Sequence, residues 1–137
     1  MADLVLDAWA VMVWLKGQQP AADRVRALLE AADRREHRLS MNIVNVGEVF
    51  YLSVKARNVV YGRRVLETLQ PRVTTISAHD ELVMLAATLK ARYAISYADG
   101  FAAATALLQG APLVTGDPEL RVMSAKEKAL QLEWIGR

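Results

Sequence analysis

The sequence of 137 residues contains no cysteine. This absence excludes disulfides, zinc sites built from thiolates and cysteine nucleophiles. It is typical of proteins that work in a reducing cytoplasm, where disulfides are rare.

Long apolar runs are also absent. The longest, residues 8–15, is far shorter than the ~20 residues that a membrane-spanning helix needs. The first residues, Met1 to Leu4, lack the basic segment of a secretory signal. We therefore expect a cytoplasmic protein with no membrane segment.

Neither sign of charge dominates, since 17 Lys and Arg face 15 Asp and Glu, for a net charge of +2. Hydrophobic residues make up 53% of the chain, which is enough for a core, and the length predicts one domain over residues 1–137. Arginines gather early in the chain, at Arg24, Arg26, Arg34, Arg35 and Arg38, and again at Arg57, Arg63, Arg64 and Arg72. They are either ordinary solvated helix faces or a rim that follows phosphates.

Strands and helices alternate along the chain. Apolar and β-branched runs predict strands over residues 4–6, 38–42, 73–76, 112–115 and 130–135, the last with the alternation of an edge strand. Helical spacing predicts a helix ending near Gly17, one opened by Pro20, four over residues 43–56, 60–69, 78–93 and 96–110, and a short one from Asp117. This order predicts an α/β fold with a parallel sheet covered by helices on both faces. Ligands bind such sheets beyond the carboxyl ends of the strands.

Two acidic residues stand at those strand ends. Asp7 directly follows the first predicted strand, and Asp117 follows residues 112–115 after Gly116. Taken alone, each is better explained as a helix N-cap than as a site residue, with Pro118 at the first helical position after Asp117.

Two further acids lie in predicted helices. Glu48 shares a mostly apolar stripe with Val44 and Leu52, where a carboxylate costs stability unless it is paired or reaches water at the stripe's edge. Asp99 lies three residues after Ser96, which is the spacing of a capping box.

The predicted topology brings the four acids to one edge of the sheet. Like charges at one site repel, and a divalent cation would compensate them. Oxygen ligands without cysteine favour Mg²⁺ or Mn²⁺ over zinc, and His37 and His79 have no evident partners and are expected at the surface. Such a metal site can activate water and stabilise charge on a phosphoryl oxygen.

At these positions the sequence resembles the PIN-domain nucleases, especially the VapC toxins of toxin–antitoxin pairs. The resemblance covers nearly the whole chain. It is carried by Leu6-Asp7-Ala8, Val46-Gly47-Glu48-Val49, Ser96-Tyr97-Ala98-Asp99 and Leu113-Val114-Thr115-Gly116-Asp117-Pro118. Each motif is weak alone, but their order and spacing are together specific.

The resemblance implies a five-stranded parallel α/β/α sandwich and Mg²⁺- or Mn²⁺-dependent cleavage of RNA. The implied site consists of the catalytic metal ligands Asp7, Glu48, Asp99 and Asp117 and of the supporting residues Thr115, Asn45 and Ser96. Thr115 would orient a carboxylate, whereas local capping or helix solvation explains Asn45 and Ser96 nearly as well. Three positions depart from the family pattern without removing an acid, namely Gly100 for alanine, Gly116 for a bulkier polar residue and Leu120 for an aromatic one.

The same resemblance implies a VapB-like antitoxin, whose tail would cover the acidic cleft, and a homodimer. Trp9, Val13 and Trp14 of the first helix are core or dimer surface.

Three alternatives compete with this interpretation. A phosphatase of the haloacid dehalogenase type needs a second Asp two residues after the first, where this chain has Trp9. A receiver-like domain needs acids and a lysine at positions that the sequence does not supply. The third is a PIN fold without strong catalysis that acts by binding RNA or a partner.

Overall fold

The computed structural model describes residues 2–137 and contains one five-stranded sheet. Its strands are β1 (Ala2–Leu6), β2 (His37–Asn42), β3 (Thr74–Ile76), β4 (Leu113–Thr115) and β5 (Leu132–Trp134). All neighbouring pairs run parallel, in the order β3-β2-β1-β4-β5. The predicted parallel sheet is therefore confirmed, and β5 lies at an edge as expected.

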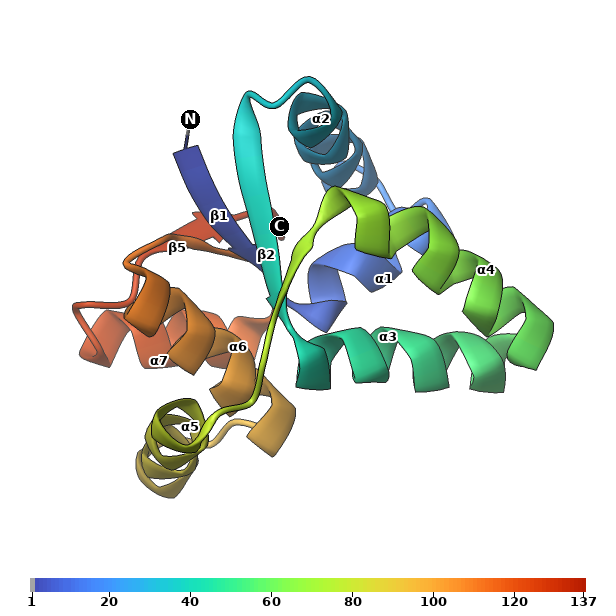
Figure 1. The fold of residues 1–137 in the computed structure, drawn as a ribbon. Helices are drawn as coiled ribbons and strands as arrows, with labels where there is room; N and C mark the ends of the chain where they lie inside the picture. The colour runs from blue at the N-terminus through green and yellow to red at the C-terminus, as the bar shows by residue number, and fades with distance from the viewer. Residues whose placement is uncertain (1) are drawn as a thin grey trace.

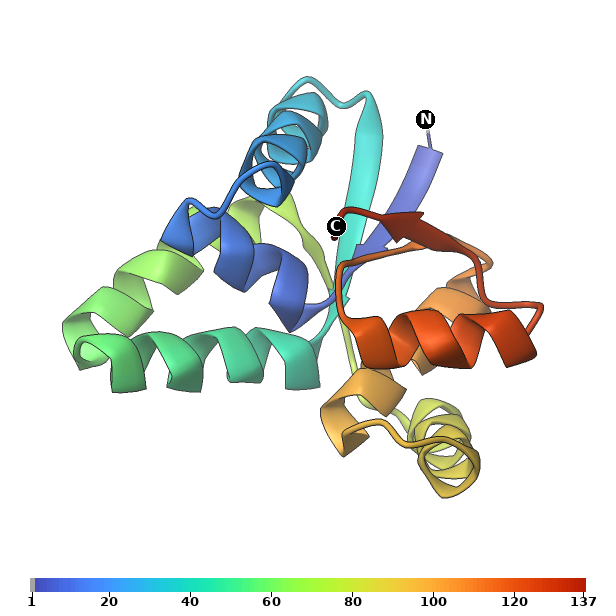
Figure 2. The same ribbon diagram turned by 180° about the vertical axis from the view of Figure 1, so that it is seen from behind.

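Helices cover both faces of this sheet, which confirms the three-layer α/β/α fold. They are α1 (Ala8–Lys16), α2 (Ala21–Asp33), α3 (Ile43–Ala56), α4 (Val59–Leu69), α5 (Asp80–Arg92), α6 (Tyr97–Gln109) and α7 (Pro118–Lys126), and a short 3₁₀ turn spans Gln70–Arg72. Figures 1 and 2 show α1 to α4 on one side of the sheet and α5 to α7 on the other. Within residues 2–137, no helix combines the length and apolarity needed to cross a bilayer.

The central strand β1 packs into both hydrophobic layers because successive side chains point to opposite faces. Leu4 and Leu6 belong to the core cluster under α1 to α4, whereas Val5 belongs to the cluster under α5 to α7. Burying an aliphatic side chain contributes about 1.5–3 kcal/mol, so this alternation fixes the register of β1 and with it the position of the next residue, Asp7.

Small residues let α6 lie close to its neighbours. Ala102, Ala103 and Ala104 are fully buried, and a Cβ atom on Gly100 would lie 2.9 Å from the carbonyl oxygen of Ala86 in α5. Gly100 is thus explained by a close helix contact, which holds the start of α6 against the rest of the domain.

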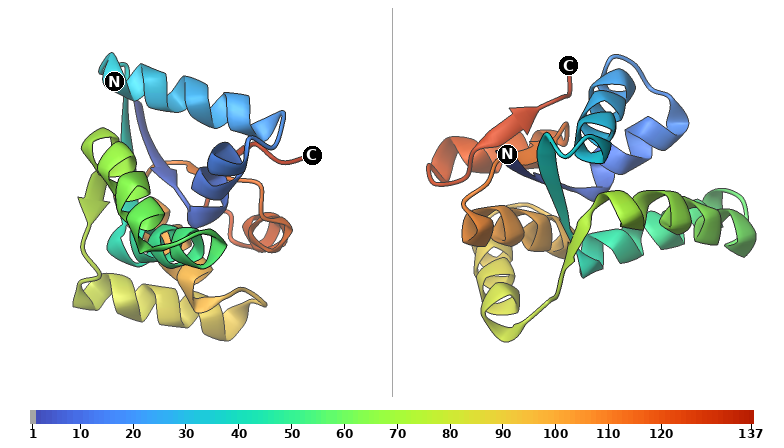
Figure 3. Two further views of the ribbon diagram at one scale, coloured as in Figure 1. Left: turned by 90° about the vertical axis from the view of Figure 1, so that its right-hand side faces the viewer. Right: turned by 45° about the horizontal axis from the view of Figure 1, so that its top comes forward.

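The C-terminal segment runs beside the turn between α1 and α2 (Figure 3). Arg24 of α2 forms an ion pair with Glu133 of β5 across this contact. Other early arginines are also paired at the surface, Arg26 with Asp23 and Arg34 with Glu36. These pairs favour solvated faces over a phosphate-binding rim for the early arginines.

Two histidines expected at the surface differ in environment. His79 is exposed, but it does have a partner, because its Nδ1 accepts a hydrogen bond from the Leu82 N–H (3.3 Å) and caps α5. For this reason α5 begins at Asp80 rather than at residue 78. His37 in β2 is partly buried and lines an open surface cavity with Arg38 and Arg72.

A matched pair of alanine substitutions, one at Gly47 and one at Gly100, tests the close packing of α6. Gly47→Ala should raise the free energy of unfolding by about 0.5–1 kcal/mol, because alanine favours helix and nothing lies within 4 Å of the added methyl group. Gly100→Ala should lower it, because contact with backbone at 2.9 Å brings an overpacking cost of about 1–3 kcal/mol. Urea denaturation measures both, and equal stabilisation by the two changes would contradict the close contact.

Candidate functional site

The sheet reverses its strand order between β1 and β4, because the chain builds β2 and β3 on one side of β1 before adding β4 and β5 on the other. Such a switch point opens a crevice at the carboxyl ends of the two strands. Asp7 follows β1 and Asp117 follows β4, so these two acids flank the crevice.

A groove of about 670 Å³ lies at this point. Its walls come from α1, α3, α6 and the start of α7, and its lining includes Trp9, Met12, Lys16, Glu48, Ser96, Asp99, Asp117 and Glu119. Three of the four predicted acids therefore line one groove, and Lys16 supplies a basic side chain to its wall.

Asp7, the fourth predicted acid, is 2% exposed. One carboxylate oxygen accepts a hydrogen bond from the Ala10 N–H at 2.8 Å, and the other accepts one from the Thr115 hydroxyl. Asp7 is therefore the N-cap of α1, and the positive end of the helix dipole faces its carboxylate.

Thr115 connects the two strand ends. The pairing of β1 with β4 brings the residues just beyond Leu6 and Val114 side by side. The Thr115 hydroxyl donates to Asp7 and accepts a hydrogen bond from the Asp117 N–H at 3.0 Å. A single side chain thus sets the spacing of two acids.

Asn45 connects two helices of the site, α3 and α6. It is 1% exposed, and its Nδ2 donates to Glu48 Oε1 and to the carbonyl oxygen of Ala98, both at 3.0 Å. This amide ties the Glu48 carboxylate in α3 to the residue before Asp99. Ser96 caps α6 by accepting a hydrogen bond from the Asp99 N–H at 3.0 Å.

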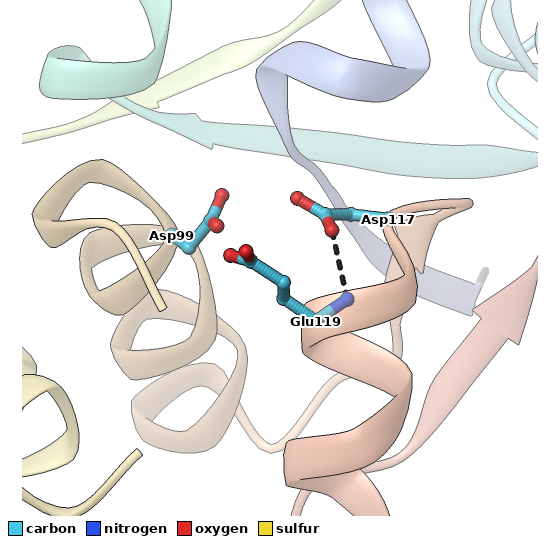
Figure 4. Close-up of side chains that lie close together, drawn as sticks. All are labelled: Asp99, Asp117 and Glu119. Carbon is cyan, nitrogen blue, oxygen red and sulfur yellow. Dashed lines mark hydrogen bonds between the residues drawn. The ribbon is translucent and has the colours of Figure 1, made fainter. Parts of the chain in front are cut away.

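Asp99, Asp117 and Glu119 form the tightest cluster of acids. Each offers a carboxylate oxygen within 4.8 Å of the others, and Figure 4 shows the three groups facing a shared space. The Glu119 N–H also donates to Asp117 Oδ1 at 2.9 Å. Glu119 was missing from the sequence prediction, although its place in the first turn of α7, two residues after Asp117, was an available signal.

Burial and repulsion between carboxylates raise the pKa values of Asp7 and Asp99. Desolvation by burial raises the pKa of Asp7 to about 7, against the opposing hydrogen bonds from Thr115 and Ala10, and repulsion from Asp99 and Asp117 adds to the rise. The pKa of Asp99 rises to about 6 through burial and repulsion from Asp117.

The same causes act on Glu48. Its pKa is raised mainly by burial, with a contribution from the charge of Asp117 and an opposing hydrogen bond from Asn45. The charges of the four predicted acids therefore interact with one another. Converging carboxylate oxygens with uncompensated repulsion are the donor set that a hard divalent cation prefers, so the cluster of Asp99, Asp117 and Glu119 fits such an ion.

Trp9 explains the unusual glycine before Asp117. A Cβ atom on Gly116 would lie 2.1 Å from the Trp9 ring, so the indole occupies the space that a side chain there would need. Trp9 and Trp14 are partly buried and Val13 is 5% exposed, which assigns Val13 to the core and Trp9 to the groove wall. Leu120 is fully buried in the core cluster under α5 to α7.

The buried Asp7 predicts a pH-dependent stability in metal-free protein. Because its pKa rises from 3.8 to about 7 on folding, the folded state binds this proton more tightly than the unfolded chain. The resulting stability is fully present below about pH 4 and is lost as the pH rises through about 7. We expect Asp7→Asn, which keeps the cap and cannot ionise, to have a higher Tm than wild type at about pH 8.

The expected gain in that comparison is at least about 4 °C, since one pKa unit is worth about 1.4 kcal/mol and 1 kcal/mol shifts Tm by about 4 °C in a domain of this size. Thermal unfolding in chelator from about pH 5 to 8 measures it. Asp3→Asn, at an exposed position of strand β1, is the control. Parallel Tm profiles for Asp7→Asn and wild type would show that Asp7 is not held above its usual pKa.

Comparisons with known proteins agree with the fold. The chain has the fold of DNA-bound VapBC from Salmonella typhimurium (TM-score 0.72, 15% identity, 98% of this chain and 99% of that chain). It is also similar to VapBC2 from Rickettsia felis bound to promoter DNA, with a TM-score of 0.70, 17% identity, and coverage of 96% of this chain and 97% of that chain. A third similar structure is VapBC-5 from Mycobacterium tuberculosis, a member of the VapBC family of toxin–antitoxin systems, with a TM-score of 0.59, 20% identity and coverage of 100% of both chains. No curated protein sequence matches the chain. The PIN domain family model matches residues 4–126, and the chain therefore belongs to the PIN domain family.

Proposed function

We propose that this chain is a Mg²⁺- or Mn²⁺-dependent endoribonuclease and the toxin of a toxin–antitoxin pair. The observation that carries the proposal is the convergence of Glu48, Asp99 and Asp117 on one groove above the buried Asp7. PIN domains are generally nucleases, and the similar VapBC structures match this chain over nearly their full length. Both facts support a nuclease more than a binding domain that has kept its acids by chance.

The four acids, together with Glu119, would hold the metal. A bound divalent ion lowers the pKa of water and stabilises charge on a phosphoryl oxygen. The raised pKa values of Asp7 (about 7) and Asp99 (about 6) mean that a nearby positive charge would favour the ionised form of both carboxylates.

Other residues hold these acids in position. The Thr115 hydroxyl fixes the Asp7 carboxylate, and the Asn45 amide fixes that of Glu48. Lys16 on the groove wall can pair with a phosphate oxygen of a bound strand, which orients the scissile phosphate toward the acids.

The proposed partner is a VapB-like antitoxin, with the pair acting in the cytoplasm. An acidic groove matches a partner tail that carries a basic side chain, because opposite charges attract most strongly where water is excluded. Exposed apolar side chains on α3 and α4, namely Ile43, Tyr51, Val59 and Val60, support the proposed homodimer.

Removal of single acids should abolish cleavage without unfolding the protein. Asp7→Asn and Asp99→Asn should each lower the rate of RNA cleavage by about 100-fold or more, because a metal ligand and its charge are lost. Purified protein, freed of any antitoxin, is incubated with structured RNAs in Mg²⁺, Mn²⁺ or chelator.

Glu81→Gln on exposed α5 is the matched control and should cleave like wild type. Cleavage that persists in chelator, or that is equal in wild type and the two Asp variants, would disprove the site.

Expression of the chain alone should arrest growth, because uncontrolled RNA cleavage stops translation. Co-expression of the small open reading frame next to its gene should restore growth, and Asp99→Asn should be harmless at equal protein levels. Colony counts after induction measure the effect. Normal growth of several hosts that express active nuclease would favour a PIN nuclease that is not a toxin.

A further inference from the structure

A second cavity adjoins the acidic groove on the other side of Trp9. It measures about 630 Å³ and its lining includes Trp9, Trp134, Pro118, Gly116, Gln18 and Arg137. We name it the Trp9–Trp134 pocket. We propose that it binds one unpaired nucleobase of the RNA strand whose phosphate lies in the acidic groove. This inference rests on the proposed function and adds a base-binding subsite to it.

The backbone places the pocket directly beside the acids, so that adjacent parts of one RNA strand could occupy both. Gly116 and Pro118 line the pocket, whereas Asp117 between them lines the groove, and consecutive Cα atoms are about 3.8 Å apart. Trp9 and Pro118 belong to the linings of both cavities. A base in the pocket would therefore belong to a nucleotide beside the phosphate at the acids.

Both indoles are held in place by the residues around them. The Trp9 ring fills the space over Gly116, where a Cβ atom would lie 2.1 Å away. The Arg121 guanidinium lies 4.7 Å from the Trp134 ring centroid, and Gly136 lets the chain pass so closely that a Cβ atom there would lie 2.6 Å from that ring. Rigid aromatic side chains are the platforms on which proteins stack single-stranded bases.

Polar groups at the pocket suit the edge of a base. Gln18 and Gln19 both line it, and an amide offers both donors and an acceptor. Two hydrogen bonds hold the Gln19 side chain, because its Nε2 donates to Asp23 Oδ1 at 2.8 Å and its Oε1 accepts from the Asp23 N–H at 3.0 Å. Gln18 is exposed. Arg137 adds positive charge for a neighbouring phosphate.

These features favour a nucleotide over an apolar side chain of a protein partner. The volume lies in the ~300–1,000 Å³ range of small-ligand sites, and aromatic walls with a few polar groups are typical of such sites. A partner's apolar anchor would use the indoles but neither the amides nor Arg137.

Abasic substitution in the RNA tests the pocket in the unaltered protein. Single-stranded RNAs are prepared with one abasic nucleotide at successive positions around the cleavage point. We expect one position next to that point to lower kcat/KM by about tenfold, because a stacked base is lost. Equal cleavage of the whole series would overturn the pocket and leave the proposed nuclease intact.

A pair of tryptophan variants tests the same pocket from the side of the protein. Trp134→Leu should lose the sensitivity to the abasic position, whereas Trp14→Phe, outside the pocket lining, should keep it. If Trp134→Leu fails to fold, Trp134→Phe combined with Gln18→Ala replaces it. Equal sensitivity in every variant would overturn the assignment.

Binding can be separated from cleavage in the Asp99→Asn background. Short single-stranded RNA should quench tryptophan fluorescence there, and Trp134→Leu should weaken binding by about tenfold. Unchanged RNA binding together with lost binding of a protein partner would assign the pocket to that partner and overturn the proposal. Failure of the wild type to cleave any RNA with metal would instead refute the proposed function.

Discussion

The buried carboxylate of Asp7 is the point around which the site is organised. It lies beyond the central strand, 2% exposed, with hydrogen bonds from the Ala10 N–H and the Thr115 hydroxyl. These bonds offset only part of the cost of burying the charge, since the pKa still rises to about 7. The burial of the Asp7 carboxylate therefore lowers the stability of the metal-free protein, and a nearby positive charge would restore it. Such a loss of stability at a functional site is the usual trade between stability and activity.

The remaining acids are carried to Asp7 by separate parts of the fold. The switch in strand order brings the β1 and β4 ends together, and Thr115 sets the distance between their acids. Asn45 joins α3 to α6 and holds Glu48 near Asp99. The close packing at Gly100 keeps the start of α6 in place. Contacts within the fold therefore set the shape of the groove.

Much of this arrangement could be predicted because it follows from local pattern. The apolar run of β1 and the caps at Asp7, Ser96 and Asp117 are local features. For Ser96 and Asp117, capping proves compatible with a place in the groove lining. Contacts between distant segments were not predictable. The Asn45 bond to Ala98 spans 53 residues, and the Trp9 ring over Gly116 spans a still longer stretch. Glu119 was missed because an exposed acid in a first helical turn is ordinary.

The central claim is that these acids form a preformed divalent-cation site, and proton release on metal binding tests it most directly. Calorimetric titration with Mn²⁺ in buffers of different ionisation enthalpy counts the protons released. With pKa values of about 7 for Asp7 and about 6 for Asp99, binding should release about one proton near pH 6.5 and almost none above about pH 8.5. Binding without proton release at either pH, or no binding at millimolar Mn²⁺, would contradict the claim.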